Sequence, residues 1–515
     1  MLNQAAANQP NRVAVYCNGR QRTWSEVAQR VPRMATALRN LGVNRGDFVS
    51  VLGMNSDRYM ELFYAVPWAG AALCPLNVRW SVAENSIAIA STGAPVLFVD
   101  DNFVSEALAL KERVPTLKQL IYMGERDTPH GMLNHEDLVA EHDASADADR
   151  RDEDVYVVFY TGGTTGHPKG VLLTHRAIVL STHGYLAMLP SIEDLSHLHT
   201  GGFFHFSGAS PLWYITLSAG SQVILPKFEP IAVMTAIDRF RVTNTVLVPT
   251  MVNMLMNHPN FEQFDLSSLR TCIYGAAPMP EALILKTMQM LPTWSFYQIY
   301  GMTESGGYAT MLRWSDHTPS SGPSSKLRSC GRPAPGFEVR IELSDGSIAP
   351  AGTIGEVMLR SDILMSGYIG DPASSAATIR DGWLHSGDAG YRDADGFIYI
   401  ADRIKDMIVT GGENVYSVEV ERALYQHEAV REAAVIGLPS DKWGETVHAV
   451  VVVKQGMSVS EQEIVAHCRG LIGNYKCPRS VEFRSEPLPV TPVGKIRKNV
   501  LREQCFSGGA SDTVA

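Results

Sequence analysis

The chain has 515 residues, of which 45% are hydrophobic and 19% are charged, and its formal net charge is −10. This length is enough for about three domains with a large core, and the excess of acidic residues argues against general nucleic-acid binding. The longest apolar stretch, residues 62–76, is interrupted by Pro67 and Pro75, whereas a membrane helix needs about 20 continuous apolar residues. We therefore expect a globular protein that binds no nucleic acid and has no transmembrane segment.

The N-terminal residues lack the cationic start and apolar middle of a signal peptide. Seven cysteines are scattered along the chain without a C-x-x-C pair, which argues against a disulfide framework and against a zinc site. We expect reduced cysteines that mostly serve packing, and a cytoplasmic protein.

Between residues 155 and 301, apolar runs rich in β-branched and aromatic residues alternate with segments of helical period. Strands are predicted at 155–160, 221–226, 245–250, 269–275 and 294–301, and helices at 176–189, 231–240 and 280–291. This alternation predicts an α/β fold of stacked βα units around a mostly parallel sheet. In 231–240, the residues Ile231, Met234, Ile237 and Phe240 are spaced three apart and are predicted to form a buried helix face.

After about residue 320 the pattern changes to short strands separated by turns, such as 355–361 and 396–403, which predicts a small β-barrel-like subdomain. A second globular unit follows, with a predicted helix from Glu461 whose Ser460 and Glu463 form a capping box.

One stretch, "FYTGGTTGHPKGVLLTH" (159–175), gathers glycines, threonines and one lysine between an apolar run and an expected helix. Glycine lets backbone N–H groups converge on an anion, which favours phosphate, although such turns taken alone are usually surface loops. It is not a Walker loop, because His167 and Pro168 precede Lys169 and Gly170 takes the Ser/Thr position.

Four further stretches accompany this loop: "YGAAP" (274–278), "YGMTES" (300–305), "DGWLHSGD" to "GGENVY" (381–416) and "PVGKIRK" (492–498). In this order and at these separations, the five stretches resemble the adenylate-forming family of acyl-CoA synthetases, luciferases and adenylation domains of peptide synthetases. The resemblance covers essentially the whole chain. It implies a large N-terminal domain over 1–402, a hinge over 403–406, and a small mobile α+β C-terminal domain over 407–515.

The resemblance implies an acid–thiol ligase that uses ATP, Mg²⁺ and coenzyme A. A carboxylic acid attacks ATP to form an acyl-AMP with release of pyrophosphate, and the acyl group then passes to the coenzyme A thiol. The loop is expected to cradle the β and γ phosphates through Thr161, Gly162, Gly163, Thr164, Thr165, Gly166 and Lys169. Where this chain has Gly163 the family usually has serine, so one hydroxyl contact is missing.

Roles for further nucleotide-binding residues are implied by the same resemblance. Thr303 contacts the α-phosphate, and Glu304 is a magnesium ligand, as suits a hard cation. Asp388 accepts from the ribose hydroxyls and Arg403 binds ribose or phosphate oxygens, the alternatives being a turn acid and a surface cation. The adenine lies beside Gly275, Ala276 and Ala277, and Tyr300 and Gly301 belong to the same nucleotide site.

The implied roles of the C-terminal part depend on rotation of its domain. Lys495 bridges the carboxylate and the α-phosphate, and Lys405 is the hinge position. Gly411 and Gly412 line a tunnel for the pantetheine arm, since a Cβ would narrow it. Trp443, with the basic stretch around Arg479, is expected to face the coenzyme A nucleotide.

The acyl site is expected to be uncharged, because residues 203–211 contain no acid. His205 is interpreted as a gate beside the carboxylate, with a packed core histidine as the alternative. Small residues at Gly306 and Gly307 predict a deep pocket that is lined by Phe206, Met251 and Tyr308.

A pocket of this kind would take a medium- or long-chain fatty acid, or a bulky aryl or alicyclic acid. Two alternatives to coenzyme A ligation remain, namely a stand-alone adenylation enzyme that loads a carrier-protein thiol and a luciferase-like oxygenase. A homodimer is the expected assembly.

Overall fold

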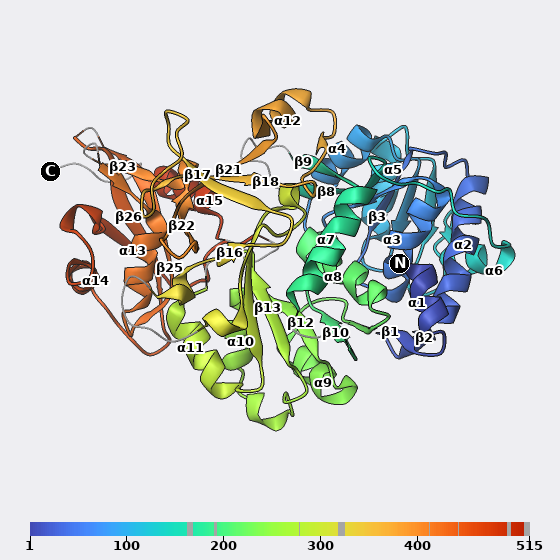
Figure 1. The fold of residues 1–515 in the computed structure, drawn as a ribbon, viewed down its shortest axis with the longest axis horizontal. Coiled ribbons are helices and arrows are strands. Elements are labelled where there is room, and N and C mark those ends of the chain that lie inside the picture. The colour runs from blue at the N-terminus through green and yellow to red at the C-terminus, as the bar shows by residue number, and fades with distance from the viewer. Residues whose placement is uncertain are drawn as a thin grey trace.

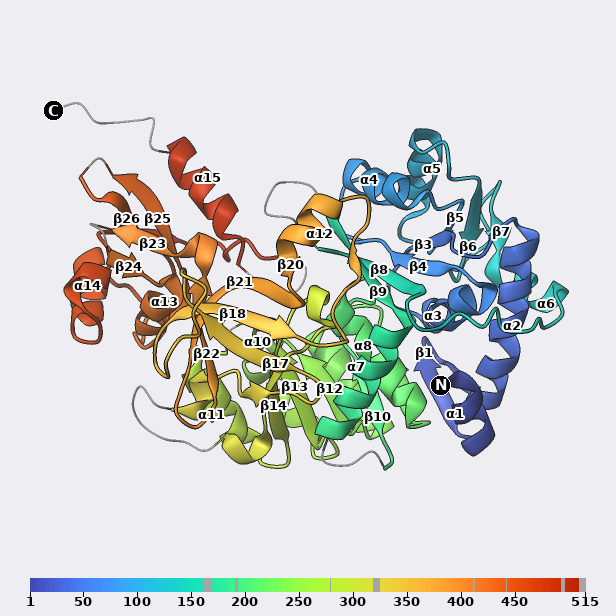
Figure 2. The ribbon, with the colours of Figure 1, turned by 45° about the horizontal axis from the view of Figure 1, so that its top comes forward.

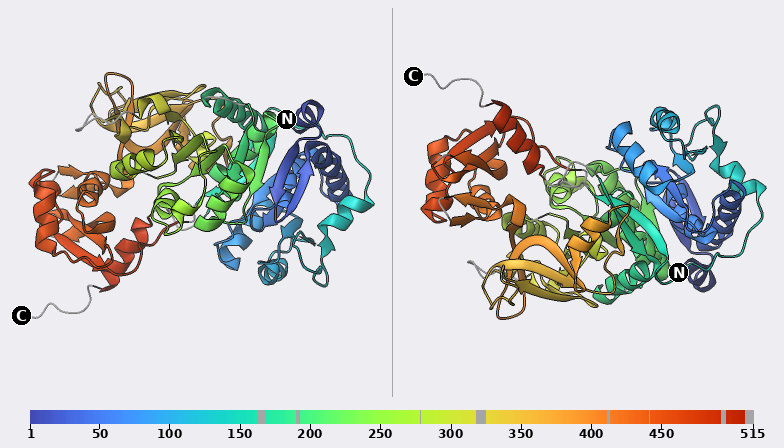
Figure 3. Two further views of the ribbon diagram at one scale, coloured as in Figure 1. Left: turned by 90° about the horizontal axis from the view of Figure 1, so that it is seen from below. Right: turned by 90° about the horizontal axis from the view of Figure 1, so that it is seen from above.

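The computed structural model of the protein describes residues 1–161, 168–189, 193–277, 279–317, 325–410, 413–440, 442–491 and 496–508, with the side chains of residues 405 and 506–508 outside that description. Two large sheets, a smaller antiparallel sheet and a C-terminal unit form an elongated molecule (Figure 1). The N-terminal elements, in blue, lie at one end and the C-terminal unit, in orange and red, lies at the other (Figure 3).

The first large sheet has eight strands in the order β19-β9-β8-β4-β3-β5-β6-β7. Its strands from β8 to β7 pair in parallel, whereas β8, β9 and β19 pair antiparallel. The strands are β3 (Phe48–Leu52), β4 (Ala72–Pro75), β5 (Val96–Val99), β6 (Gln119–Tyr122), β7 (Leu133–Asn134), β8 (Val155–Thr161), β9 (Lys169–Thr174) and β19 (Gly367–Tyr368). The accompanying helices are α1 (Leu2–Asn8), α2 (Trp24–Asn40), α3 (Asp57–Ala69), α4 (Val82–Thr92), α5 (Val104–Arg113), α6 (His135–Glu141) and α7 (His175–Met188).

The second large sheet has nine strands in the order β16-β15-β14-β13-β12-β10-β11-β1-β2, and all pairs from β14 to β1 are parallel. The strands are β1 (Val13–Cys17), β2 (Arg20–Thr23), β10 (Ser196–His199), β11 (Ser221–Ile224), β12 (Asn244–Leu247), β13 (Thr271–Gly275), β14 (Ser295–Tyr300), β15 (Thr310–Leu312) and β16 (Arg332–Pro333). The helices are α8 (Phe206–Leu217), α9 (Pro230–Phe240), α10 (Pro249–Met256) and α11 (Glu281–Met290).

Helices α3 and α8 join the two large sheets through one hydrophobic core. The rings of Phe63 and Trp213 lie 5.7 Å apart, and the Tyr64 hydroxyl donates to the Leu212 carbonyl oxygen at 2.9 Å. The predicted α/β class with mostly parallel strands is therefore confirmed, with two sheets in place of one.

Helix α9 corrects one detail of the predicted buried face. Met234 and Ile237 are fully buried, whereas Ile231 is 39% exposed. Ile231 lies in the first turn, and the helix packs through its later turns, so the three-residue spacing overestimated the length of the buried face.

The small antiparallel sheet follows the two large sheets, as predicted. Its strands are β17 (Glu338–Glu342), β18 (Gly355–Arg360), β20 (Ile379–Arg380), β21 (Trp383–Arg392) and β22 (Ile398–Arg403), and helix α12 (Pro372–Thr378) precedes β20. Strand β22 ends where the predicted hinge begins, and a single turn, Ile404–Asp406, leads to the C-terminal unit. The pivot role of this turn stays a prediction.

The C-terminal unit is a five-stranded sheet with helices on both faces (Figure 2). Its elements are β23 (Ile408–Thr410), β24 (Glu413–Val415), α13 (Ser417–Tyr425), β25 (Val430–Ser440), β26 (Gly444–Val453), α14 (Glu461–Arg469), β27 (Ser480–Arg484) and α15 (Lys498–Gly508). Alternate residues of β26 face opposite sides of the sheet, so that Val451 packs with α13 and α14, whereas Val452 packs with Leu501 of α15. The predicted α+β unit and the Ser460–Glu463 capping box are confirmed.

All seven cysteines are free, and all but Cys505 are buried. Among the described residues, no helix is both long and apolar enough to cross a bilayer.

Candidate active site

The glycine-rich loop connects two antiparallel strands. Thr161 at the end of β8 pairs with Lys169 at the start of β9, and the Thr161 hydroxyl lies 3.5 Å from the Lys169 carbonyl oxygen. The helix predicted over 176–189 is confirmed as α7, which begins at His175, and β9 lies between the glycine-rich turn and this helix. Residues Gly162, Gly163, Thr164, Thr165 and Gly166 lie outside the described residues.

Lys169 and Glu304 belong to one cluster, although they come from two motifs that lie far apart in the sequence. The Lys169 ammonium lies 2.9 Å from the Ser374 hydroxyl and 5.0 Å from the centre of the Tyr368 ring. The Tyr368 hydroxyl in turn donates to Glu304 Oε1 at 2.9 Å. Strand β19, which carries Tyr368, pairs with β9 and thereby sets these contacts.

Sequence reasoning missed Tyr368 and Ser374. The signal was the stretch "SGYIGDP" (366–372), in which two glycines flank the tyrosine. Gly367 and Gly370 have φ values of 148° and 67°, which L side chains rarely adopt.

Thr303 and Glu304 form a short 3-10 turn directly after β14. The Gly306 amide donates to the Thr303 carbonyl oxygen at 3.1 Å, and the Met365 amide donates to that of Glu304 at 2.9 Å. Both side chains are half-exposed. Thr303 and Glu304 lie beyond the carboxyl end of β14, which pairs in parallel with β13. Open α/β sheets bind ligands at this end of their strands.

Asp388 holds the centre of a second cluster. Its Oδ1 accepts from Arg403 Nε at 2.7 Å, and its Oδ2 accepts from the Tyr300 hydroxyl at 2.6 Å. Asp388 is 4% exposed, while the Arg403 side chain is 40% exposed. Burial and the neighbouring Asp388 carboxylate raise the pKa of Tyr300 well above its usual value, so the phenol stays protonated and donates to the Asp388 carboxylate.

The register of the small sheet explains how these groups meet. Asp388 on β21 and Arg403 on β22 are directly paired across the two strands. Burial by itself would lower the pKa of Arg403, but the Asp388 carboxylate raises it, so the guanidinium stays charged. Two predicted ribose-site residues are thus brought together, with Tyr300 from the other predicted motif beside them.

Small residues in the predicted nucleotide site are also required by the backbone packing around them. A Cβ on Gly275 would lie 2.4 Å from the Ile299 carbonyl oxygen, and a Cβ on Gly301 would lie 2.5 Å from the Tyr308 Cα. Ala276 adopts φ 65°, in the left-handed region. Gly275 and Gly301 therefore lack a Cβ because another backbone segment approaches closely, and contact of Gly275, Ala276 and Ala277 with a purine stays a prediction.

His205 is the N-cap residue directly before helix α8, and its ring centre lies 4.5 Å from that of Phe204. The histidine is half-buried beside an aromatic side chain, an arrangement that suits both the predicted gate and a packed core position.

The prediction of a deep acyl pocket behind Gly306 and Gly307 is wrong, because the space beside these two residues is filled. A Cβ on Gly306 would lie 2.4 Å from Ile363 Cγ2, and one on Gly307 would lie 2.3 Å from Phe206 Cδ1. The two glycines have φ values of 64° and 88°, so they serve a turn, and neighbouring side chains fill the space that sequence reasoning left open.

Tyr308 closes the same wall. Its side chain is fully buried, with ring centres 4.7 Å from Tyr185 and 5.3 Å from Phe337. Among the described residues the hydroxyl has no hydrogen-bond partner, and it lies against Gly184, where a Cβ would be 1.6 Å from the hydroxyl oxygen. Met251 is only half-buried on α10.

The two residues predicted to face the coenzyme A nucleotide, Trp443 and Arg479, are exposed on the C-terminal unit. Trp443 is 39% exposed, and the cations of Lys442 and Arg479 lie 5.0 and 5.6 Å from its ring centre. Lys495, Gly411 and Gly412 lie outside the described residues.

Polar contacts hold the C-terminal unit around the predicted hinge. Asp402, at the end of β22, accepts from the Ser417 hydroxyl at 2.6 Å. The Lys498 ammonium lies 2.8 Å from Glu421 and also donates to Ser417. These buried groups connect α13 and α15 to the last strand before the turn.

Comparison with known proteins gives one consistent result. The model of the AMP-binding enzyme family matches residues 2–369, and that of the AMP-binding enzyme C-terminal domain matches residues 419–495. A feruloyl-CoA synthase from Amycolatopsis sp is 36% identical over 496 residues, covering 96% of each chain. A fatty acid–[acyl-carrier-protein] ligase from Streptomyces coeruleorubidus is 33% identical over 98% of this chain and 96% of its own. Among solved structures, an anthranilate–CoA ligase in complex with anthranoyl-AMP matches with a TM-score of 0.90 and 28% identity, over 99% of this chain and 98% of its own.

Proposed function

The chain belongs to the AMP-binding enzyme family, and from that premise we propose that the clusters around Asp388 and Glu304 hold ATP while an acyl adenylate forms. The predicted resemblance to adenylate-forming enzymes is confirmed, and so is the predicted class, an AMP-forming acyl-CoA synthetase. What we propose in addition is the role of each site residue, the acid that is activated, and Mg²⁺ as the metal.

The Asp388 cluster supports the ribose role most strongly. Both carboxylate oxygens are oriented by Arg403 and Tyr300, and a carboxylate oxygen can accept more than one hydrogen bond. Arg403 uses Nε for this ion pair, and its guanidinium has further N–H groups for ribose or phosphate oxygens. A buried, preorganised carboxylate of this kind suits two adjacent hydroxyl groups.

The Lys169 cluster supports the phosphate and magnesium roles. Glu304 offers a carboxylate whose Oε1 is oriented by Tyr368, and Mg²⁺ is usually held by one or two carboxylates together with phosphates and water. The donor set therefore fits Mg²⁺, with Glu304 as its ligand. The ion would neutralise charge as pyrophosphate leaves, and Lys169 and Thr303 lie in the same region to bind phosphate oxygens.

The chemistry then proceeds in two displacements. A carboxylate oxygen attacks the α-phosphorus, the bond to the β-phosphate oxygen breaks, and pyrophosphate leaves with the electron pair. The coenzyme A thiol next attacks the acyl carbonyl, loses its proton, and expels AMP. We assign Lys495 to the first step, where its charge would hold two anions together, and the "GGEN" loop with Gly411 and Gly412 to the second.

Coenzyme A is the proposed acceptor, and the Trp443 surface is the proposed contact for its nucleotide part. The exposed indole, with Lys442 and Arg479 beside it, offers a face for stacking and two cations for phosphates. A carrier-protein thiol is the second candidate, because one relative is named as an acyl-carrier-protein ligase.

The proposed substrate is a carboxylic acid whose acyl tail is uncharged and carries a bulky aryl or alicyclic group, and a medium-chain fatty acid is the alternative. The wall of Gly306, Gly307 and Tyr308 is filled by packed side chains, which favours a compact group over a long chain. A relative named as a feruloyl-CoA synthase supports the same direction. We further propose a cytoplasmic homodimer, and light scattering of the purified protein would test its assembly.

A panel of acids assayed for pyrophosphate and AMP release tests the proposal, with coenzyme A or a carrier protein as the acceptor. Lys495→Ala should lose about 10²-fold or more in adenylate formation, the effect of removing one preorganised charge, yet still convert supplied acyl-AMP. Lys454→Ala, which removes an exposed lysine of the same unit, is the control. Equal loss in both half-reactions would contradict the role of Lys495, and release of AMP only with carrier protein would contradict coenzyme A as acceptor.

A further inference from the structure

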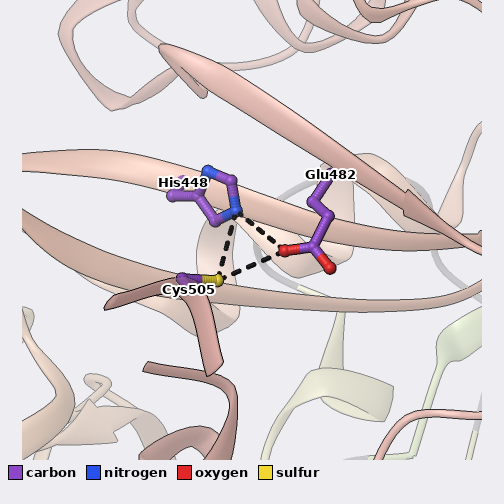
Figure 4. A group of neighbouring side chains, drawn as sticks. All are labelled: His448, Glu482 and Cys505. Atoms are coloured by element: carbon purple, nitrogen blue, oxygen red, sulfur yellow. Dashed lines mark hydrogen bonds and ion pairs between the residues drawn. The ribbon is translucent and has the colours of Figure 1, made fainter. Parts of the chain in front are cut away.

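Three potential metal ligands meet in the C-terminal unit, outside every motif that the enzyme class explains. His448 lies on β26, Glu482 on β27 and Cys505 on α15, and their side chains converge (Figure 4). Within the part of the chain that the structure describes, this is the one group of three or more His, Cys, Asp or Glu side chains with ligand atoms this close together.

The distances between the ligand atoms suit one small cation. His448 Nε2 lies 3.8 Å from Cys505 Sγ and 3.8 Å from Glu482 Oε2, and the last two atoms lie 3.3 Å apart. Tetrahedral zinc with its usual bond lengths places such atoms roughly 3.4–3.6 Å from one another. Each pair therefore needs to move by only a few tenths of an ångström.

Neighbouring groups orient two of the three ligands. His448 Nδ1 shares a hydrogen bond of 2.7 Å with the Ser480 hydroxyl, and in the tautomer in which Nδ1 donates this bond, the Nε2 lone pair faces the thiol. Arg484 Nε donates to Glu482 Oε1 at 2.5 Å, which directs Oε2 toward Cys505 and His448. Hydrogen bonds from outside the ligand set are what fix ligand orientation in natural metal sites.

Burial and charge favour a cation that accepts nitrogen and sulfur ligands. His448 is 8% exposed, whereas Glu482 and Cys505 are half-buried, so solvent can reach the site. The Cys505 thiol donates to Glu482 Oε2 at 3.3 Å, so the S–H group already points toward the carboxylate that would share the metal with it.

We propose that His448, Glu482 and Cys505 bind one Zn²⁺ ion, with water as the fourth ligand, and that the ion fastens helix α15 to strands β26 and β27. On binding, the S–H bond of Cys505 breaks, its proton passes to solvent, and a zinc–sulfur bond forms without any change in oxidation state. Helix α15 begins at Lys498, three positions after Lys495 in the sequence.

Metal binding to the full-length protein tests this site. After treatment with chelator, the protein is titrated with Zn²⁺ or Co²⁺ in excess Mg²⁺, which occupies oxygen-only sites but does not compete for a thiolate. We expect one metal per chain, a thiolate-to-cobalt charge-transfer absorption, and a higher melting temperature with zinc, since a ligand that binds only the folded state stabilises it.

Variants separate this site from other thiols. Cys505→Ser and His448→Gln should abolish the charge-transfer absorption and the thermal shift, while Cys477→Ser, which removes a buried thiol of the same unit, should retain both. If wild-type protein binds no metal at this stoichiometry, or if Cys505→Ser behaves as wild type does, the cluster is only a hydrogen-bonded group. Wild-type titration decides the question even if a variant fails to fold.

Discussion

Tyr308 offers a sharp test of the packing assigned to the acyl wall. Within the described part of the chain its buried hydroxyl has no hydrogen-bond partner, and a buried polar group left in that state costs about 1–3 kcal/mol. Tyr308→Phe removes the hydroxyl and keeps the ring between Tyr185 and Phe337. The variant should therefore be more stable than the wild type by an amount of this order.

Tyr64→Phe is the matched control, because it removes a buried hydroxyl that is satisfied. The Tyr64 hydroxyl lies 2.9 Å from the Leu212 carbonyl oxygen and 2.6 Å from the Thr216 hydroxyl. With about 1 kcal/mol for each hydrogen bond, this variant should lose about 2 kcal/mol.

Thermal unfolding of wild type and the two variants in one buffer measures the difference. Tyr308→Phe should melt above wild type and Tyr64→Phe below it, and the profile of accepted acids should be unchanged for Tyr308→Phe. The reasoning is refuted if Tyr308→Phe melts as low as Tyr64→Phe, because its hydroxyl must then have a partner, or if the acid profile changes, because the hydroxyl must then reach the substrate.

Further substitutions test the turn, the ribose site and the hinge. Gly306→Met should destabilise the protein by about 1–3 kcal/mol through its positive φ and the clash with Ile363, so its melting temperature should fall; an unchanged melting temperature would show that the wall has room. Asp388→Asn removes the charge that pairs with Arg403 and should raise the KM for ATP at least about tenfold while the KM for the acid changes little; similar increases for both substrates would argue against a ribose contact. Lys405→Pro fixes φ near about −65° and should leave one half-reaction intact and stop the other, whereas two half-reactions at wild-type rates would show that the pivot lies elsewhere.

Local patterns in the sequence determined the elements and the family. Apolar runs and helical periods placed strands such as β13 and helices such as α11, because burial on one face imposes a fixed period. The motifs around Lys169, Glu304 and Asp388 carried the resemblance, because phosphate and ribose chemistry restricts the residue types at those positions. The roles of these residues could be predicted from short sequence motifs, without knowing which distant segments they contact.

Contacts between distant segments were decided by the tertiary structure alone. Tyr368 joins Lys169 to Glu304 only because β19 pairs with β9. Among the described residues, the predicted pocket beside Gly306 and Gly307 is absent because Ile363 and Phe206 fill that space. Spacing of the cysteines argued against zinc, since the sequence lacks the local pairs that mark such sites. The proposed site of His448, Glu482 and Cys505 is built from two strands and a helix. Its ligands come together only through the packing of these elements, so no short sequence spacing marks the site.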